Sequence, residues 1–180
     1  MDKEDSRILI LADGMGSGIR ANILATLTSK IIATMMYNDM SIDEVVATIA
    51  KTLPLSSVNG VAYSTFSIIQ VYYTGEIYVV EYDNPECILV RQGKVKALPF
   101  SYRKIEGKKI RECRFQTLPG DALAIMSDGC LYCGTGDIMN YRWDWNALAG
   151  CCESSAAKTR TAAQLAEQMN RACADLYGGV

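Results

Sequence analysis

Strand-like segments in the middle of the chain are joined in pairs by very short turns, and this arrangement restricts the fold more than any other feature. The turns are Thr74-Gly75, Gln92-Gly93 and Pro119-Gly120-Asp121. Residues of this kind favour tight chain reversals, and strands joined by such reversals pair antiparallel. The sequence therefore predicts three hairpins, formed by residues 64–73 with 76–82, 87–91 with 94–98, and 110–118 with 122–127.

Helical patterns precede this strand-rich block. An apolar run over 7–12 predicts a buried strand, and apolar residues then recur at three- and four-residue steps over 19–37. Ser41 followed by Glu44 has the spacing of a capping box and predicts a second helix, which ends before Pro54.

Two more helices are predicted after the strands, over residues 143–151 and 161–177. The order of strand, two helices, antiparallel strands and helices predicts an α+β fold with helices on the outer faces of the sheets. We expect a single domain, residues 1–180, since the chain length is typical of one domain.

Charge and hydropathy exclude several classes of protein. The formal net charge is −2, which argues against a sequence-independent nucleic-acid binder. No apolar run approaches the roughly 20 residues that a membrane span needs, and the first five residues do not resemble a signal peptide. We expect a cytoplasmic protein that binds neither nucleic acid nor membrane.

The cysteine and histidine contents restrict the chemistry. The seven cysteines are an odd number and form a poor disulfide framework, so we expect free thiols. Cys130 and Cys133 have CxxC spacing, but no second CxxC follows and the chain has no histidine. Imidazole-based catalysis is therefore excluded within this chain, and carboxylates, lysine, thiolate or an oxygen-bound metal remain.

Two apolar segments each run into an Asp-Gly step, at Asp13-Gly14 and Asp128-Gly129. One such step is usually only a turn. Two aspartates at the ends of central strands lie near the core, where carboxylates that approach each other need a shared proton or a metal. Carboxylate and carbonyl oxygens are the ligands that Mg²⁺ and Mn²⁺ prefer, so the pair predicts a divalent metal site.

A nucleotide-binding loop is the rival explanation for the glycines after Asp13. A dinucleotide fingerprint would need glycine where Ile19 stands, and a Walker loop would need a Gly-Lys-Ser/Thr sequence. Neither pattern is present, and the segment after the first helix looks helical where a strand would be required. A metal site is therefore the favoured interpretation of Asp13 and the glycines that follow it.

Several motifs, taken together and in order, resemble the SpoIIE-like branch of the metal-dependent (type 2C, PPM) serine/threonine protein phosphatases. The similarity extends over residues 7–178. It is carried by residues 13–18 with Ala21, by 72–76, 81–85 and 89–94, and by 119–121 with 126–129.

This resemblance implies a two-layer antiparallel β-sandwich flanked by helices, with a dinuclear Mn²⁺ or Mg²⁺ centre. In the family, the first aspartate bridges both metals and the next glycine contributes its carbonyl, which assigns these roles to Asp13 and Gly14. The second aspartate binds one metal, which assigns that role to Asp128. Asp13 and Asp128 are thus the implied catalytic residues, and a metal-activated water attacks the phosphate.

The sequence also departs from the family pattern. Only six residues precede Arg7, so the acidic strand expected upstream is missing, and the Gly-Asp-Asp-Thr element expected downstream is missing too. We expect incomplete sheet edges that allow self-association, and one metal ion or none in this chain. Either the chain is a trimmed piece of a longer protein, which we favour, or it is a short member that has lost catalysis.

The predicted function is metal-dependent hydrolysis of a phosphoserine or phosphothreonine protein in bacterial regulation. The alternative is a catalytically inactive phosphatase-fold module that binds a partner. Ser17 and Arg20 are candidate contacts for the substrate phosphate. A helix cap at Ser17 and a solvated first-turn side chain at Arg20 are the simpler interpretations.

Overall fold

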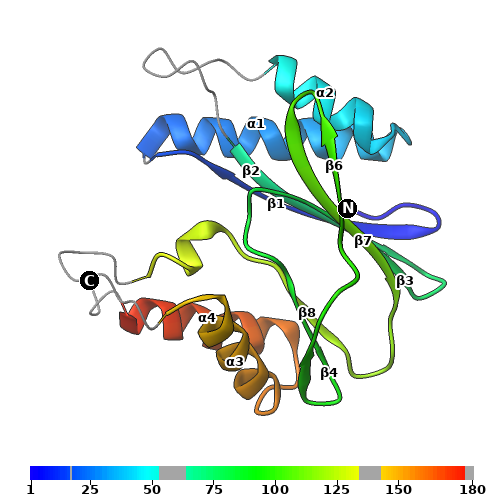
Figure 1. Cartoon of the computed structure of the whole chain (residues 1–180). Helices are drawn as coiled ribbons and strands as arrows, with labels where there is room; N and C mark the ends of the chain where they lie inside the picture. The colour runs from blue at the N-terminus through cyan, green and yellow to red at the C-terminus, as the bar shows by residue number, and fades with distance from the viewer. Residues whose placement is uncertain (17, 53–63, 134–142, 177–180) are drawn as a thin grey trace. The chain divides into compact units, whose positions relative to one another are not determined.

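The computed structural model describes residues 1–16, 18–52, 64–133 and 143–176 (Figure 1). The chain forms two compact units, which are described one at a time. The first, unit 1, is Met1–Asn84 with Pro99–Thr117, and the second, unit 2, is Pro85–Leu98 with Leu118–Val180.

Unit 1 contains a five-stranded antiparallel sheet and two helices. The strands lie in the order β1-β2-β3-β7-β6, so β1 and β6 are the edge strands of this sheet. The elements are β1 (Ser6–Gly14), α1 (Gly18–Tyr37), α2 (Ile42–Thr52), β2 (Ser64–Tyr72), β3 (Glu76–Tyr82), β6 (Ser101–Ile105) and β7 (Lys108–Gln116).

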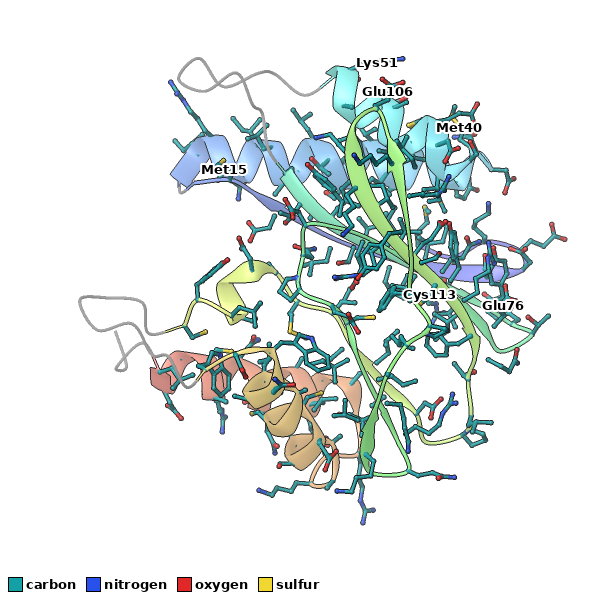
Figure 2. All side chains as sticks on the ribbon, viewed as in Figure 1. Met15, Met40, Lys51, Glu76, Glu106 and Cys113 are labelled. Atoms are coloured by element: carbon teal, nitrogen blue, oxygen red, sulfur yellow. The ribbon has the colours of Figure 1, made fainter. Side chains whose placement is uncertain are left out.

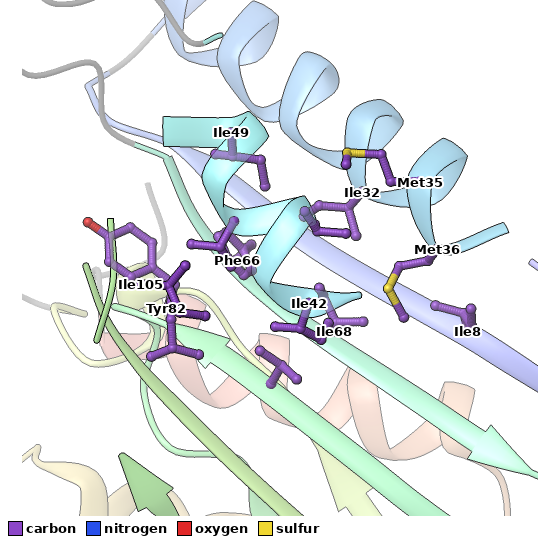
Figure 3. Packing of buried hydrophobic residues seen from close by; sticks show 14 residues of the cluster. Ile8, Ile32, Met35, Met36, Ile42, Ile49, Phe66, Ile68, Tyr82 and Ile105 are labelled. Carbon is purple, nitrogen blue, oxygen red and sulfur yellow. The ribbon is translucent and has the colours of Figure 1, made fainter. Parts of the chain in front are cut away.

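The core of unit 1 lies between the two helices and one face of the sheet. Alternate residues of β1 and β2, such as Ile8, Phe66 and Ile68, point to this face and pack against α1 and α2 (Figure 3). α2 begins as predicted, because the backbone N–H of Glu44 donates to Ser41 Oγ at 3.3 Å and the Ser41 N–H donates to Glu44 Oε2 at 2.9 Å.

Unit 2 contains a three-stranded antiparallel sheet, in the order β5-β4-β8, and two helices. Its own core includes Ile88, Val90, Leu148 and Cys152. The indole N–H of Trp145 donates to the Glu86 carbonyl at 2.9 Å and so ties the start of α3 to the segment before β4. The elements are β4 (Ile88–Arg91), β5 (Lys94–Lys96), β8 (Ala122–Ala124), a 3₁₀ helix η1 (Asp128–Cys130), α3 (Trp145–Ala156) and α4 (Ala162–Leu176).

The predicted fold class, α+β with antiparallel sheets and flanking helices, is confirmed. The first two predicted hairpins are β2–β3 and β4–β5. The second reverses through Gln92 and Gly93, whose φ values of 53° and 71° are those of a type I′ turn.

The third predicted hairpin is wrong. β7 pairs with β3 and β6, whereas β8 pairs with β4 in the other sheet. The turn at Pro119-Gly120-Asp121 reverses the chain, but Asp121 is bound by Arg91 of β4, which holds this segment beside β4. The strand β6 is not among those predicted from the sequence.

Two expectations about burial are also wrong. The sequence predicts Leu9 in a buried strand, yet it is exposed, because it points to the face of β1 opposite to that of Ile8, which packs in the core. Ile23 and Leu27 belong to the apolar repeat of α1 but are exposed, while Thr28 and Ile32 are buried. The apolar repeat is broader than the face of α1 that packs on the sheet.

Within the part of the chain that the structure describes, no helix has both the length and the apolar content needed to cross a membrane.

Candidate functional site

Asp13 lies near the end of the edge strand β1, directly opposite Thr65 of β2. Its side chain is partly exposed. Among the described residues no basic group forms an ion pair with it. The carboxylate therefore remains available to a cation.

The backbone of β1 directs the Gly14 carbonyl away from β2. Ile8 exchanges both of its backbone hydrogen bonds with Met1, at 2.8 and 2.9 Å, on the outer edge of β1. Backbone hydrogen-bonding groups alternate in direction along a strand, so those of Gly14 point to the same outer edge. The Asp13 carbonyl points the other way, toward β2, and accepts from Ser64 Oγ at 2.7 Å.

Position 14 accepts only glycine. A Cβ there would lie 2.1 Å from the Ala21 carbonyl oxygen of α1, far closer than van der Waals contact allows. Gly16 and Gly18 have φ values of 94° and 76°, which turn the chain sharply from β1 into α1. Met15 is exposed at this turn (Figure 2). The glycines therefore bring the first turn of α1 against the end of β1.

Polar side chains follow the same face of the sheet as Asp13. Thr65 is buried, and among the described residues its hydroxyl has no hydrogen-bond partner. Asn84 is also buried; its Nδ2 donates to Ser67 Oγ at 2.9 Å, while its Oδ1 finds no partner in the described part of the chain. The Thr65 hydroxyl, directly opposite Asp13, and the Asn84 Oδ1 beyond the end of β3 are thus unsatisfied among the described residues.

A buried ion pair borders this polar group. The Arg111 guanidinium donates to Glu81 Oε2 at 2.8 Å and to the Asn84 carbonyl at 3.0 Å. Glu81 pairs with Ser67 in the β2–β3 ladder, so the ion pair is adjacent to the Ser67–Asn84 contact. Arg111 therefore fixes the chain where β3 ends at Asn84.

Asp128 is the first residue of η1 in unit 2. The predicted strand before it is shorter than expected, because β8 ends at Ala124 and residues 125–127 separate it from Asp128. The Asp128 carbonyl accepts from the Leu131 N–H at 2.8 Å, which closes the turn. The indole N–H of Trp143 donates to the Cys130 carbonyl at 2.8 Å, and Cys133 Sγ donates to the Gly129 carbonyl at 3.1 Å.

These contacts fix the backbone of the loop that carries Asp128 and do not involve the Asp128 carboxylate. Among the described residues no ion pair engages Asp128. Asp13 and Asp128 belong to different units, so a site shared by the two stays a prediction.

The CxxC motif is made of free thiols, as expected. Burial raises the pKa of the Cys130 thiol and, with the help of hydrogen bonds to Cys133 and Cys130, the pKa of the Cys173 thiol. Thiols of this kind are protonated and unreactive at neutral pH. In the described ranges no group of three histidine, cysteine, aspartate or glutamate side chains is arranged to hold a metal ion.

The two predicted phosphate contacts remain predictions. Ser17 lies outside the described residues. Arg20 is exposed in the first turn of α1, and within the described chain it has no acidic partner. Its position therefore agrees with the simpler interpretation, a solvated side chain, and leaves the guanidinium available to an anion.

The donors around Asp13 suit a hard divalent cation. They are the two oxygens of a carboxylate that has no basic partner among the described residues and the carbonyl oxygen of Gly14, directed to the strand edge. All are oxygens, which Mg²⁺ and Mn²⁺ prefer over nitrogen or sulfur ligands. The residues present in unit 1 therefore fit part of a divalent metal site.

Known proteins resemble this chain in sequence profile and in fold. The sequence profile of a family described as Stage II sporulation protein E (SpoIIE) matches residues 3–179. A search among curated proteins gives no significant match.

Solved structures with the same fold include two large bacterial proteins. The PP2C phosphatase domain of SpoIIE from Bacillus subtilis, solved with a fragment of its regulatory domain, matches with a TM-score of 0.72 and 18% identity, over 97% of this chain and 51% of that one. The RsbU and RsbW domains of Rv1364c from Mycobacterium tuberculosis match with a TM-score of 0.74 and 16% identity, over 95% and 48%. The chain thus spans about half the length of these two proteins.

RsbX, solved in complex with magnesium, is a shorter relative in fold. It matches with a TM-score of 0.65 and 16% identity, over 98% of this chain and 79% of RsbX. At these identities the comparisons show a shared PP2C-type phosphatase fold.

Proposed function

The chain belongs to the SpoIIE family, and from this premise we propose that it is a phosphoprotein phosphatase that uses Mn²⁺ or Mg²⁺ and acts on phosphoserine or phosphothreonine. The observation that carries the proposal is the end of β1, where the Asp13 carboxylate has no basic partner among the described residues and the Gly14 carbonyl points to the open edge. The fold shared with PP2C-type domains supports it.

Each residue of the site has a role in this proposal. Asp13 and Gly14 hold the cation with a carboxylate and a carbonyl oxygen, and Asp128 contributes a second carboxylate from the loop of η1. When bound, a divalent cation supplies a deprotonated water at neutral pH and neutralises charge on the phosphoryl group. Arg20, and Ser17 if it faces the same site, bind the phosphate oxygens of the substrate.

The proposal also covers the organisation of the chain. Both units belong to one phosphatase-like domain, since the family profile runs through unit 1 and unit 2 without interruption. A role in bacterial regulation is proposed by analogy with the bacterial proteins that share the fold. The cytoplasmic location expected from the sequence stays a prediction.

Self-association through the edge of β1 is the proposed contact with a second copy. Residues 1–3 fold back along the first part of this edge, with the Met1–Ile8 hydrogen bonds and an Asp2–Arg7 bridge. Beyond Ile8, no strand of the described chain pairs with the outer edge, which leaves the backbone groups of Ile10 and Ala12 for another strand.

Hydrolysis of an aryl phosphate and of a phosphoserine peptide, each with and without Mn²⁺, tests the function. We expect hydrolysis that requires the metal and is lost in Asp13→Asn and in Asp128→Asn, while Asp39→Asn, an exposed change in unit 1, retains it. Metal-independent hydrolysis, or full activity in Asp13→Asn, would contradict the proposal. Binding of the phosphopeptide without turnover would support the alternative, a phosphatase-fold binding module.

A further inference from the structure

The hydroxyl of Thr65 is an unsatisfied polar group in a buried position. The residue is 5% exposed, and its Oγ1 forms no hydrogen bond with any described residue, Asp13 included. Leaving a buried hydroxyl without a partner costs about 1–3 kcal/mol. Such groups are rare in folded proteins, and each one calls for an explanation.

Thr65 stands directly across from Asp13 in the β1–β2 ladder. Opposite residues of an antiparallel pair project from the same face, with Cβ atoms about 5 Å apart. This is the face away from the helices, because Phe66, the next residue, packs in the core beneath α1 and α2. The side chains of Thr65 and Asp13 therefore project from the same face of two neighbouring strands.

The described contacts give the hydroxyl no structural role. Valine has nearly the same shape as threonine and an equal preference for strands, and it would avoid the cost of the unsatisfied oxygen. The nearby Ser64 and Ser67 hydroxyls, by contrast, both form hydrogen bonds, to the Asp13 carbonyl and from Asn84 Nδ2. Thr65 is thus the hydroxyl at this end of β2 whose oxygen the described contacts leave unexplained.

We propose that Thr65 is a positioning residue of the metal site: when a divalent cation is bound, its hydroxyl turns to donate a hydrogen bond to the Asp13 carboxylate and orients that group toward the cation. The inference rests on the proposed function, since it requires a cation at Asp13. An ionised carboxylate only accepts hydrogen bonds and Thr65 has one proton to donate, so the two groups are complementary. A metal-bound carboxylate is normally held by such a partner.

Thr28 provides a matched control. It lies on α1 in the helix-covered core, is fully buried, and in the described chain its hydroxyl is also without a partner. Thr65→Val and Thr28→Val therefore remove the same group from equally buried sites, and only the first site faces Asp13. Thr65→Ser retains the hydroxyl and serves as the conservative variant.

Titration of the whole chain with Mn²⁺, followed by calorimetry and by the shift in thermal midpoint, tests the inference without relying on activity. We expect Thr65→Val to weaken Mn²⁺ binding roughly tenfold, the lower end of the effect of removing a group that supports a metal ligand. Thr65→Ser and Thr28→Val should bind within twofold of the unsubstituted chain. Both valine variants should unfold at or above its thermal midpoint without metal.

The outcomes separate this inference from the function on which it rests. If Mn²⁺ binds the unsubstituted chain, is lost in Asp13→Asn and is unchanged in Thr65→Val, then Thr65 holds only a structural water and the inference fails alone. If Thr28→Val weakens binding as much as Thr65→Val, the effect is general and the inference also fails. If the unsubstituted chain does not bind Mn²⁺, the inference about Thr65 is overturned, whereas the proposed function is decided by the hydrolysis assay.

Discussion

Arg111 of β7 and Glu81 of β3 form a buried ion pair, with Arg111 Nη2 2.7 Å from Glu81 Oε2 and the Glu81 side chain only 1% exposed. The pair joins neighbouring strands in register and also reaches the Asn84 carbonyl, where the chain leaves the sheet of unit 1. It thereby holds the end of β3 beside β2, the strand that separates β3 from β1 and Asp13.

Replacing Arg111 with alanine should destabilise the protein strongly. The change leaves the Glu81 carboxylate buried without its cation, and loss of one partner of a buried pair costs about 3–5 kcal/mol. Chemical denaturation measures the free energy of unfolding. Arg171→Ala, which removes an exposed pair with Glu167 on α4, is the control and should change it by less than about 0.5 kcal/mol. Equal effects of the two variants would contradict the assignment.

Stability should depend on Asp121 at acidic pH. Hydrogen bonds from Arg91 lower the pKa of this carboxyl from its ordinary value of 3.8, and the side chain is 7% exposed. Because the folded-state pKa is lowered, the stabilisation is complete above the ordinary pKa and is lost as the pH falls through the folded-state value.

The test compares thermal midpoints of the unsubstituted chain and Asp121→Asn between pH 7 and pH 2. We expect the variant to be less stable at neutral pH and the difference to shrink below about pH 4. A difference that stays constant over the whole range would show that the charge of Asp121 is not responsible.

Gly14→Ala should destabilise the protein, because the new Cβ would lie 2.1 Å from the Ala21 carbonyl oxygen. Either β1 or the first turn of α1 must shift, at a cost of about 1–3 kcal/mol. Gly150→Ala is the matched control: it lies on an exposed face of α3 with nothing within 4 Å of the added atom, and should raise stability by about 0.5–1 kcal/mol. Opposite signs in denaturation curves are the expected result.

Gln92→Gly should stabilise the β4–β5 hairpin. Gln92 has φ of 53°, in the left-handed region, where a side chain costs about 1 kcal/mol relative to glycine. The gain should be somewhat smaller than this, since glycine also loses more entropy on folding. Gln92→Ala removes the same side chain but keeps the Cβ, so it should give no gain in thermal midpoint. A gain in both variants would mean that the stabilisation does not come from removing the Cβ at position 92.

Local features were predictable because they depend on a few consecutive residues. The capping box at Ser41 and Glu44, the turn at Gln92-Gly93 and the glycine-rich passage after Asp13 each follow from the conformations that those residues tolerate. The turn at Pro119-Gly120-Asp121 was also recognised, but not where it leads. The turn residues reverse the chain but do not specify the strand with which β8 pairs. In the structure β8 pairs with β4, and Arg91 of β4 binds Asp121 of the turn.

The candidate site likewise contains residues that can be recognised in the sequence and residues that cannot. Asp13, Gly14 and Asp128 are visible in the sequence because an Asp-Gly step follows an apolar run in both places. No short sequence pattern marks Thr65, Glu81 or Arg111, because the role of each depends on the residue opposite it in the sheet. The register in which distant segments pair as strands brings these residues together, and no short sequence pattern encodes that register.

By itself, then, the sequence determined the element types, most of the tight turns, the absence of imidazole chemistry and the two aspartates that the proposal uses. Tertiary structure alone decided that β1 is an edge strand, that part of the apolar repeat of α1 is exposed and that Thr65 faces Asp13. The physical reason is range: backbone preferences act over a few residues, whereas burial and strand pairing are set by groups far apart in the chain.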